Sequence, residues 1–306
     1  MSKIIVGVGA SERDKDAVAL ASTLARSSGA EIVLACVYPY DEIPGRGANT
    51  AYRNYLREDA EAAIRTAQED IADLPGVAGR TVAEVSPAKG IQLLAEREGA
   101  SLVVIGSSGR GAVGRVLAGT TAERLLHGAP CPVAVAPTGY HDHAANDIAT
   151  VSVAFDRSKE AMAALTGAVT VSGALGAKLR VVEVLDSTWM GTPALMAGPG
   201  YSLPPSDTEE RLRRNLVAIV DGLPDELAVE PVVTVGEPEA ELAEETANTD
   251  LMVVGSRGYG PHRAVLLGSV SGRLVRDSAC PVLVVPRTIE APLEELFAPV
   301  SGTHAV

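Results

Sequence analysis

The sequence has few cysteines and no long apolar run, and each absence excludes a class of protein. The three cysteines, Cys36, Cys131 and Cys280, form no CxxC pair and leave an odd number, which is typical of a reducing compartment rather than of a disulfide scaffold. No apolar run approaches the length of a bilayer span, so no membrane-spanning helix is predicted. The first residues turn charged too soon for a signal peptide. We therefore expect a cytoplasmic protein.

Basic residues are also scarce, and the formal net charge at pH 7 is −13. Proteins that bind nucleic acid or an anionic membrane surface usually do so through clustered Lys and Arg side chains. We therefore expect neither nucleic acid nor a membrane among the partners. The length of 306 residues and the hydrophobic content of 46% instead predict a globular protein with a substantial core, in two domains of about 150 residues each.

Several well-known catalytic and phosphate-binding motifs are missing as well. The chain has no Gly-Lys-Ser/Thr of a P-loop, no G-x-S-x-G and no HExxH. Residues 109–114 spell GxGxxG, but they follow the fourth expected strand, whereas the dinucleotide fingerprint follows the first and has an acid about 20 residues later. The sequence thus predicts a binding protein without an identifiable catalytic set, and slow ATP hydrolysis stays open as an alternative.

What the chain does contain is one unit repeated twice. Residues 106–137 align without gaps with residues 255–286 and are identical at 14 of 32 positions. The copies span residues 1–143 and 148–290, and residues 291–306 form a C-terminal tail in which one or two helical turns and otherwise little order are expected. Within the first copy, apolar and β-branched runs predict strands at residues 4–8, 32–37, 81–85, 102–105 and 133–136.

Helical patterns separate these strands, which indicates a parallel sheet with helices on both faces. The third helix is expected to open at Pro87, a favoured first-turn residue, and to end before Gly99. Each copy is therefore predicted to be a doubly wound α/β domain. In such domains the ligand lies beyond the carboxyl ends of the strands.

A glycine-rich loop begins at one such strand end in each copy. Glycine lets the backbone approach a ligand closely, and its amides together with the following helix N-terminus bind phosphate without a positive side chain. A phosphate site of this kind is compatible with an acidic protein. The spacing kept in both copies is Gly106, Gly109 and Gly119-Thr120, then Gly255, Gly258 and Gly268-Ser269.

This spacing resembles the nucleotide-binding signature of the universal stress protein family, and its flanks agree, with an apolar strand before it and "CPV" after it. The resemblance covers nearly the whole chain and is of the tandem, two-domain type. It implies Rossmann-like five-stranded parallel sheets of order 3-2-1-4-5 and ATP bound through its phosphates on the loop. It also implies that the last strands, "PVAVA" and "PVLVV", pair within the chain as an internal pseudo-dimer.

Carried over residue by residue, the resemblance assigns nucleotide binding to two sets of positions. In the first copy they are Gly7, Gly106, Ser107, Ser108, Gly109, Arg110, Gly111, Gly119, Thr120 and Thr121. In the second copy they are Asp156, Gly255, Ser256, Arg257, Gly258, Tyr259, Gly260, Gly268, Ser269 and Val270. The hydroxyl group after the last glycine is implied to contact phosphate, and adenine to lie against the ends of the first two strands.

The family's first strand commonly ends in an Asp that contacts the nucleotide or its metal. Asp156 stands there in the second copy and is the candidate ligand for Mg²⁺, whereas the first copy has Gly9. From the residues alone, Asp156 is equally a candidate for the N-cap of the next helix, with Ser158 as the competitor. The two sites are therefore predicted to be unequal.

Two functions remain open at this point. The first is an ATP-binding, cytoplasmic, nucleotide-dependent regulator of a stress response, acting on a regulatory protein partner and able to form a homodimer. The second is a scaffold or dimerisation protein of the same fold, in which the glycines form a tight strand-to-helix turn and bind nothing.

Overall fold

The computed structural model describes residues 2–9, 11, 14–40, 50–107, 120–142, 147–187, 205–256, 268–286 and 292–297. The first half of the chain consists of β1 Lys3–Val8, α1 Asp14–Ser28, β2 Glu31–Tyr38, α2 Thr50–Glu69, β3 Ala78–Ala83, α3 Pro87–Glu98, β4 Leu102–Gly106, α4 Thr120–Leu126 and β5 Val133–Ala136. A short 3-10 turn at Tyr140–Asp142 then leads to the second half.

The second half repeats this order of elements. It consists of β6 Thr150–Ala154, α5 Lys159–Leu175, β7 Lys178–Asp186, α7 Pro205–Val220, β8 Val229–Gly236, α8 Pro238–Glu245, β9 Leu251–Gly255, α9 Ser269–Asp277 and β10 Val282–Val285. A last helix, α10, spans Pro292–Phe297.

All ten strands form one sheet, in the order β3-β2-β1-β4-β5-β10-β9-β6-β7-β8. Each half therefore has the predicted order 3-2-1-4-5, with parallel pairing throughout. The two halves meet where β5 pairs antiparallel with β10, for instance Ala134 with Leu283. The fold class and the internal pseudo-dimer expected from the sequence are confirmed.

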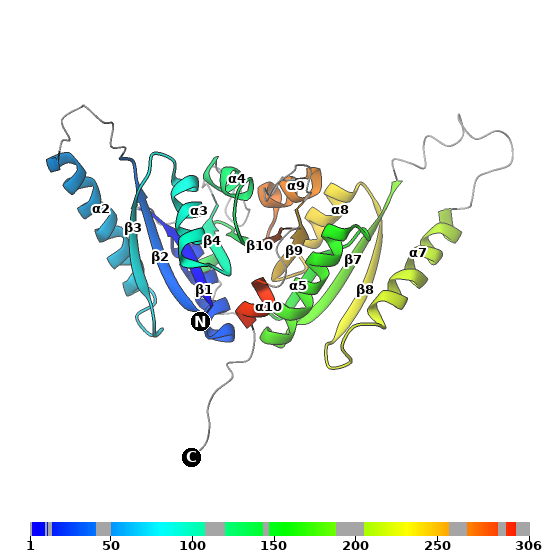
Figure 1. Ribbon diagram of the computed structural model, residues 1–306. Coiled ribbons are helices and arrows are strands. Elements are labelled where there is room, and N and C mark those ends of the chain that lie inside the picture. Colours follow the sequence, from blue (N-terminus) through cyan, green and yellow to red (C-terminus); the bar gives the residue numbers. More distant parts are fainter. Residues whose placement is uncertain are drawn as a thin grey trace, which may run out of the picture.

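Helices cover both faces of this sheet (Figure 1). Alternate residues of each strand point to opposite faces, so Ile4 and Val6 of β1 join the core beneath α1, α2, α5, α7 and α10. Ile5 joins the core beneath α3, α4, α8 and α9. Because both faces are covered, β4, β5, β9 and β10 are apolar along their whole length, as is typical of strands buried on both faces.

The third strand lies earlier than the sequence predicted. It spans Ala78–Ala83 rather than residues 81–85, and its register with β2 begins at Val33 paired with Ala78. At the edge of the sheet β3 is only half-buried, so Gly79 and Arg80 are tolerated there and the strand has no apolar signature. The prediction failed because an edge strand is set by backbone pairing more than by burial.

The C-terminal tail also differs from the expectation of little order. Helix α10 buries Leu293 and Leu296 to 3% and 1% exposure and packs against α5, where Leu293 lies beside Gly167. The hydroxyl of Ser2 donates to the carbonyl of Glu295 at 2.7 Å, so this helix contacts both halves of the chain. Leu293 and Leu296, three positions apart, indicated a helical turn or two, but they were too weak a signal to predict that this helix packs on the core.

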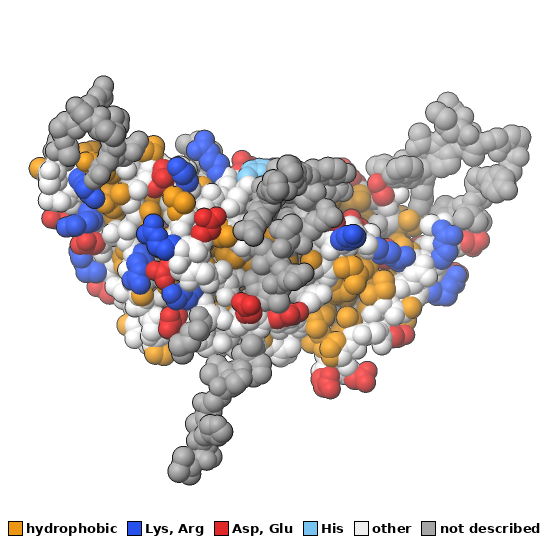
Figure 2. All heavy atoms as spheres, viewed as in Figure 1, with side chains coloured by type: hydrophobic (Ala, Val, Ile, Leu, Met, Phe, Trp, Pro, Cys, Tyr) orange, Lys and Arg blue, Asp and Glu red, His pale blue; other side chains and the backbone are white. Residues whose placement is uncertain are grey.

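On the face shown in Figure 2, Lys and Arg side chains of the described residues are interspersed with Asp and Glu and form no continuous basic surface. Within the described ranges, no helix is both long enough and apolar enough to cross a bilayer.

The three cysteines are buried, free thiols. Burial raises the pKa of Cys36 to about 11 and that of Cys131 and Cys280 to about 12. Since the thiolate is the reactive form, we expect a thiol reagent at pH 8 to modify the folded protein roughly 100-fold more slowly than the urea-unfolded protein. Rapid modification of one thiol in the folded state would contradict this, and Cys36→Ser would identify whether the least buried thiol is responsible.

Candidate functional site

A cavity of about 820 Å³ lies at the carboxyl ends of β6, β7 and β9. Strand β6 lies between β7 and β9. The chain therefore adds β7 on one side of β6 and later adds β9 on its other side. This arrangement is a topological switch point, where doubly wound sheets leave a crevice for ligands. The cavity is therefore in the place that the fold itself predicts for a binding site.

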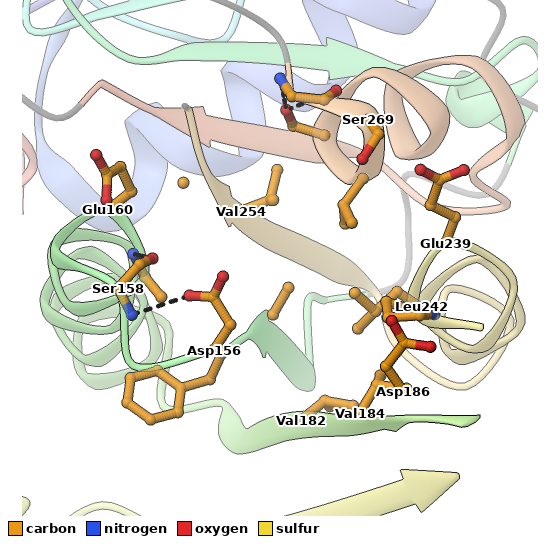
Figure 3. Close-up of a pocket in the computed structure, with 18 of the residues that line it drawn as sticks. Asp156, Ser158, Glu160, Val182, Val184, Asp186, Glu239, Leu242, Val254 and Ser269 are labelled. Carbon is orange, nitrogen blue, oxygen red and sulfur yellow. Dashed lines mark hydrogen bonds between the residues drawn. The ribbon is translucent and has the colours of Figure 1, made fainter. Parts of the chain in front are cut away.

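The cavity has an apolar floor and a polar rim. Apolar residues from the strand ends and from α8 form the floor, among them Ala154, Val182, Val184, Leu242 and Val254. Ser158, Glu239 and Ser269 lie at the N-terminal ends of α5, α8 and α9 (Figure 3). Three helix N-termini thus border one space, and their free amides and dipoles favour an anionic group near the rim.

The loop between β6 and α5 shows which of the two candidates is the N-cap of α5. Ser158 is the N-cap of α5, and its hydroxyl accepts a hydrogen bond from the amide of Ala161 at 3.1 Å. Asp156 is exposed, and its Oδ1 accepts from the amide of Ser158 at 3.0 Å. The competing candidate, Ser158, caps the helix, while the side chain of Asp156 points into the cavity (Figure 3).

Arg157 holds this loop in an unusual conformation. Among the described residues it is the one non-glycine with positive φ, at 64°, a conformation that costs an L-residue about 1 kcal/mol. Its guanidinium donates to Oε2 of Glu183 at 2.9 Å. Burial raises the pKa of Glu183, and the Arg157 ion pair opposes that shift. The ion pair thus anchors the strained residue beside Asp156.

Two of the predicted glycines have packing reasons of their own. A Cβ added to Gly255 would lie 2.6 Å from the carbonyl oxygen of Glu160, in the first turn of α5. A Cβ on Gly7 would lie 3.0 Å from side-chain atoms of both Ile91 and Ile105. Gly255 lines the cavity. Gly7 packs beneath α3, so a glycine there is explained by the close packing.

In the first half, the loop between β1 and α1 is contacted by a carboxylate from the start of α1. Gly9 replaces the strand-end Asp, and its amide donates to Oδ2 of Asp14 at 2.7 Å, as does the amide of Ser11 at 3.2 Å. Asp14 is the first residue of α1. Sequence reasoning missed it, although an acid in the first turn of a helix is a recognised signal for contact with free amides.

The predicted site residues fall into three groups. Those that line the cavity are Asp156, Gly255, Gly268, Ser269 and Val270. Those that lie at strand ends or helix starts elsewhere are Gly7, Gly106, Ser107, Thr120, Thr121 and Ser256. Those outside the described residues are Ser108, Gly109, Arg110, Gly111, Gly119, Arg257, Gly258, Tyr259 and Gly260.

Among the lining residues that were not predicted, four are acidic: Glu160, Asp186, Glu237 and Glu239. In the part of the chain that the structure describes, no group of three or more His, Cys, Asp or Glu side chains could hold a metal ion. The candidate metal role of Asp156 thus has no second and third protein ligand there.

Comparison with known proteins gives consistent results. Residues 1–137 and 148–286 each match the model of the universal stress protein family. A universal stress protein of Mycolicibacterium smegmatis is 31% identical over 289 residues, covering 92% of this chain and 96% of the relative. One from Mycobacterium tuberculosis H37Rv is 26% identical over 297 residues, covering 92% and 99%.

Among solved structures, a universal stress protein from Archaeoglobus fulgidus superposes with a TM-score of 0.67 at 22% identity. The superposition covers 93% of this chain and 98% of that protein. At this identity the likeness concerns the fold, and it extends over both halves.

Proposed function

Because the chain belongs to the universal stress protein family, we propose that it binds ATP at the carboxyl ends of its strands and acts as a nucleotide-dependent regulator of a stress response. The observation that carries this proposal is the cavity at the β6–β9 switch point, with three helix N-termini on its rim. Its volume of about 820 Å³ lies within the range of small-molecule sites.

The residues present fit an adenine nucleotide. The apolar floor, for example Val184 and Leu242, suits the flat face of a base. The start of α9, with the hydroxyl of Ser269, suits a phosphate, because amides and a hydroxyl donate to its oxygens. Asp156 would accept from a ribose hydroxyl or contact Mg²⁺ carried by the phosphates, since Mg²⁺ is usually held by one or two carboxylates together with substrate phosphates.

The proposed action is regulatory. Ligand occupancy would change the surface that the second half offers to a protein partner. We also place the protein in the cytoplasm, because its cysteines are all free thiols and a reducing compartment keeps them so.

A second candidate function, a scaffold that takes no nucleotide, is supported by Gly255. Its close approach to the backbone of Glu160 explains that glycine without any ligand. The same contact, however, keeps α5 close to the end of β9, where both border the cavity. The packing role of Gly255 is therefore compatible with a ligand as well.

Ser269→Ala tests the proposal. With excess Mg²⁺, we expect calorimetric titration of ATP to show about a tenfold higher Kd at the second-half site, because one hydrogen bond to a charged group is lost. Ser27→Ala, on the exposed surface of α1, is the matched control and should leave the Kd unchanged. If ATP, ADP, AMP and adenosine all fail to bind the unaltered protein, the scaffold function is correct instead.

A further inference from the structure

A glycine inside α5 leaves a notch that the C-terminal helix fills. Gly167 lies in the middle of α5, where glycine weakens a helix relative to alanine. A Cβ at Gly167 would lie 2.8 Å from Cδ1 of Leu293 and 3.5 Å from Cγ2 of Val285. The missing side chain therefore makes room for Leu293 of α10 against the end of β10.

In the first half, the matching position carries a side chain of its own. Helices α1 and α5 are each followed by a glycine with positive φ, Gly29 and Gly176. Nine residues before these glycines lie Leu20 in α1 and Gly167 in α5. Leu20 is fully buried, in the core on the same face of the sheet as Leu293. The first half thus fills this space from within its helix, whereas the second half fills it with a leucine from the tail.

Helix α10 depends on its docking contacts, because it has only six residues and isolated helices shorter than about 12 residues are not stable in water. Leu293 and Leu296 are buried against the core, and the carbonyl of Glu295 accepts the hydrogen bond from Ser2. A longer helix with the same two leucines would lose less conformational entropy on docking, since more of its helical order exists before it binds.

The docked helix lies on the outside of the molecule. Figure 1 shows α10 at the seam between the two halves, beside α5 and close to the N-terminus. It contacts α5, α1 and β4, and the side chains of Glu294 and Glu295 are exposed. One face of α10 is therefore apolar and buried, and the other is acidic and faces solvent, as in an amphipathic helix that docks in a groove.

We propose that the notch at Gly167 is a docking site for an amphipathic helix of a partner protein, and that α10 is its built-in competitor. The chemistry of the partner follows from α10 itself: two leucines three positions apart on one face, and polar residues on the other. Neither Gly167 nor Leu293 is among the residues that line the cavity. The inference therefore does not rest on nucleotide binding.

The test uses the full chain and a fluorescein-labelled synthetic peptide of residues 288–300, with binding followed by fluorescence anisotropy. In the unaltered protein the tethered α10 competes at an effective concentration of about 1 mM. In Leu293→Ser/Leu296→Ser the notch loses this competitor, so the peptide should bind this variant at least tenfold more tightly than it binds the unaltered chain. A peptide with serine at both leucine positions should bind neither protein.

A second peptide tests whether a longer helix displaces α10. It carries the sequence of α10 followed by eight alanine and lysine residues, which favour helix. We expect it to bind the unaltered chain at least tenfold more tightly than the first peptide does. Hydrogen exchange of the α10 amides should become faster when it binds, because α10 leaves the notch. Unchanged exchange at saturating peptide would show that α10 does not give way.

Gly167→Leu fills the notch with the residue that α1 has at Leu20. In an otherwise unaltered chain, we expect hydrogen exchange of the α10 amides to become at least tenfold faster while the amides of α5 stay protected. Added to Leu293→Ser/Leu296→Ser, it should abolish peptide binding. Gly173→Leu is the matched control, since a Cβ on Gly173 meets no heavy atom within 4 Å, and it should change neither result.

The remaining outcomes decide against the inference. If the peptide does not bind Leu293→Ser/Leu296→Ser, or binds equally well after Gly167→Leu is added, the notch is not a docking site. Should the serine variant fail to fold, α10 amides that stay protected in Gly167→Leu overturn the inference alone. If light scattering shows a dimer of the unaltered chain that Gly167→Leu abolishes, the occupant is the α10 of a second copy, and the partner helix is wrong.

Discussion

Replacing Gly255 by alanine should destabilise the second half of the protein by about 1–3 kcal/mol, the usual cost of forcing an extra methyl group into a packed site. The added Cβ would lie 2.6 Å from the carbonyl oxygen of Glu160 and 2.7 Å from its carbonyl carbon. Both are backbone atoms, so no side-chain rotation relieves the clash. Either α5 or the end of β9 must move.

The same movement should weaken ligand binding. Helix α5 carries Ser158 and Glu160 at its start, and both line the cavity with Gly255. We therefore expect the substitution to lower the midpoint of thermal unfolding, followed by circular dichroism, and to raise the Kd for adenosine as well. A protein that is as stable as the unaltered chain would show that the contact with Glu160 is not as close as the structure has it.

Gly173→Ala is the matched control, because Gly173 lies within α5 and a Cβ there would meet no heavy atom within 4 Å. Alanine is a better helix former than glycine, so this change should stabilise the protein by about 0.5–1 kcal/mol. Opposite signs for the two glycine substitutions would distinguish a backbone clash from a general effect of removing glycine.

The second large effect is expected at Glu245, at the end of α8. Its Oε1 accepts from the hydroxyl of Ser152 at 2.9 Å and from Nε of Arg180 at 2.7 Å. Ser152 is fully buried and Glu245 is 7% exposed. Glu245→Ala would leave the guanidinium and the hydroxyl without this partner, at a cost of about 2–4 kcal/mol measured by urea denaturation.

In the first half, apolar residues stand at the positions that correspond to Ser152 and Arg180. Ile5 and Val33 stand in register where the second half has Ser152 and Arg180, and both are buried in the apolar core beneath α3. We therefore expect Ser152→Ile/Arg180→Val/Glu245→Leu to recover most of the lost stability. Glu230 would then lose Arg180 but keep its ion pair with Lys178 at 2.7 Å. If Glu245→Ala alone is harmless, the network contributes nothing to stability.

The sequence predicts the topology well because the central strands carry their own signature. β1, β4 and β5 are largely buried on both faces, so their sequences are mostly apolar runs. The same strands recur in the second copy, which strengthens each prediction. The edge strand β3 escaped prediction at its start, since only half of it is buried. Where the burial of a residue depends on residues far away in the sequence, the local pattern of apolar and polar residues does not predict it.

The candidate site could be located from the sequence but not fully described. The glycines were found because they recur at fixed spacing, and Asp156 because the first strand of the family commonly ends in an Asp. Asp186, Glu237 and Glu239 were not, because they come from the end of β7 and the start of α8 and converge only when the sheet forms. Asp14 is a different case, since its partners Gly9 and Ser11 are only five and three residues away and an acid in the first turn of a helix is itself a local signal.

The pairing of β5 with β10 fixes the relation between the two binding ends. Strands run the same way within each half and opposite ways at that pairing. A displacement at one binding end can therefore reach the other through the three paired backbone positions of this strand pair and through α10, which packs on α5 and accepts a hydrogen bond from Ser2 of the first half.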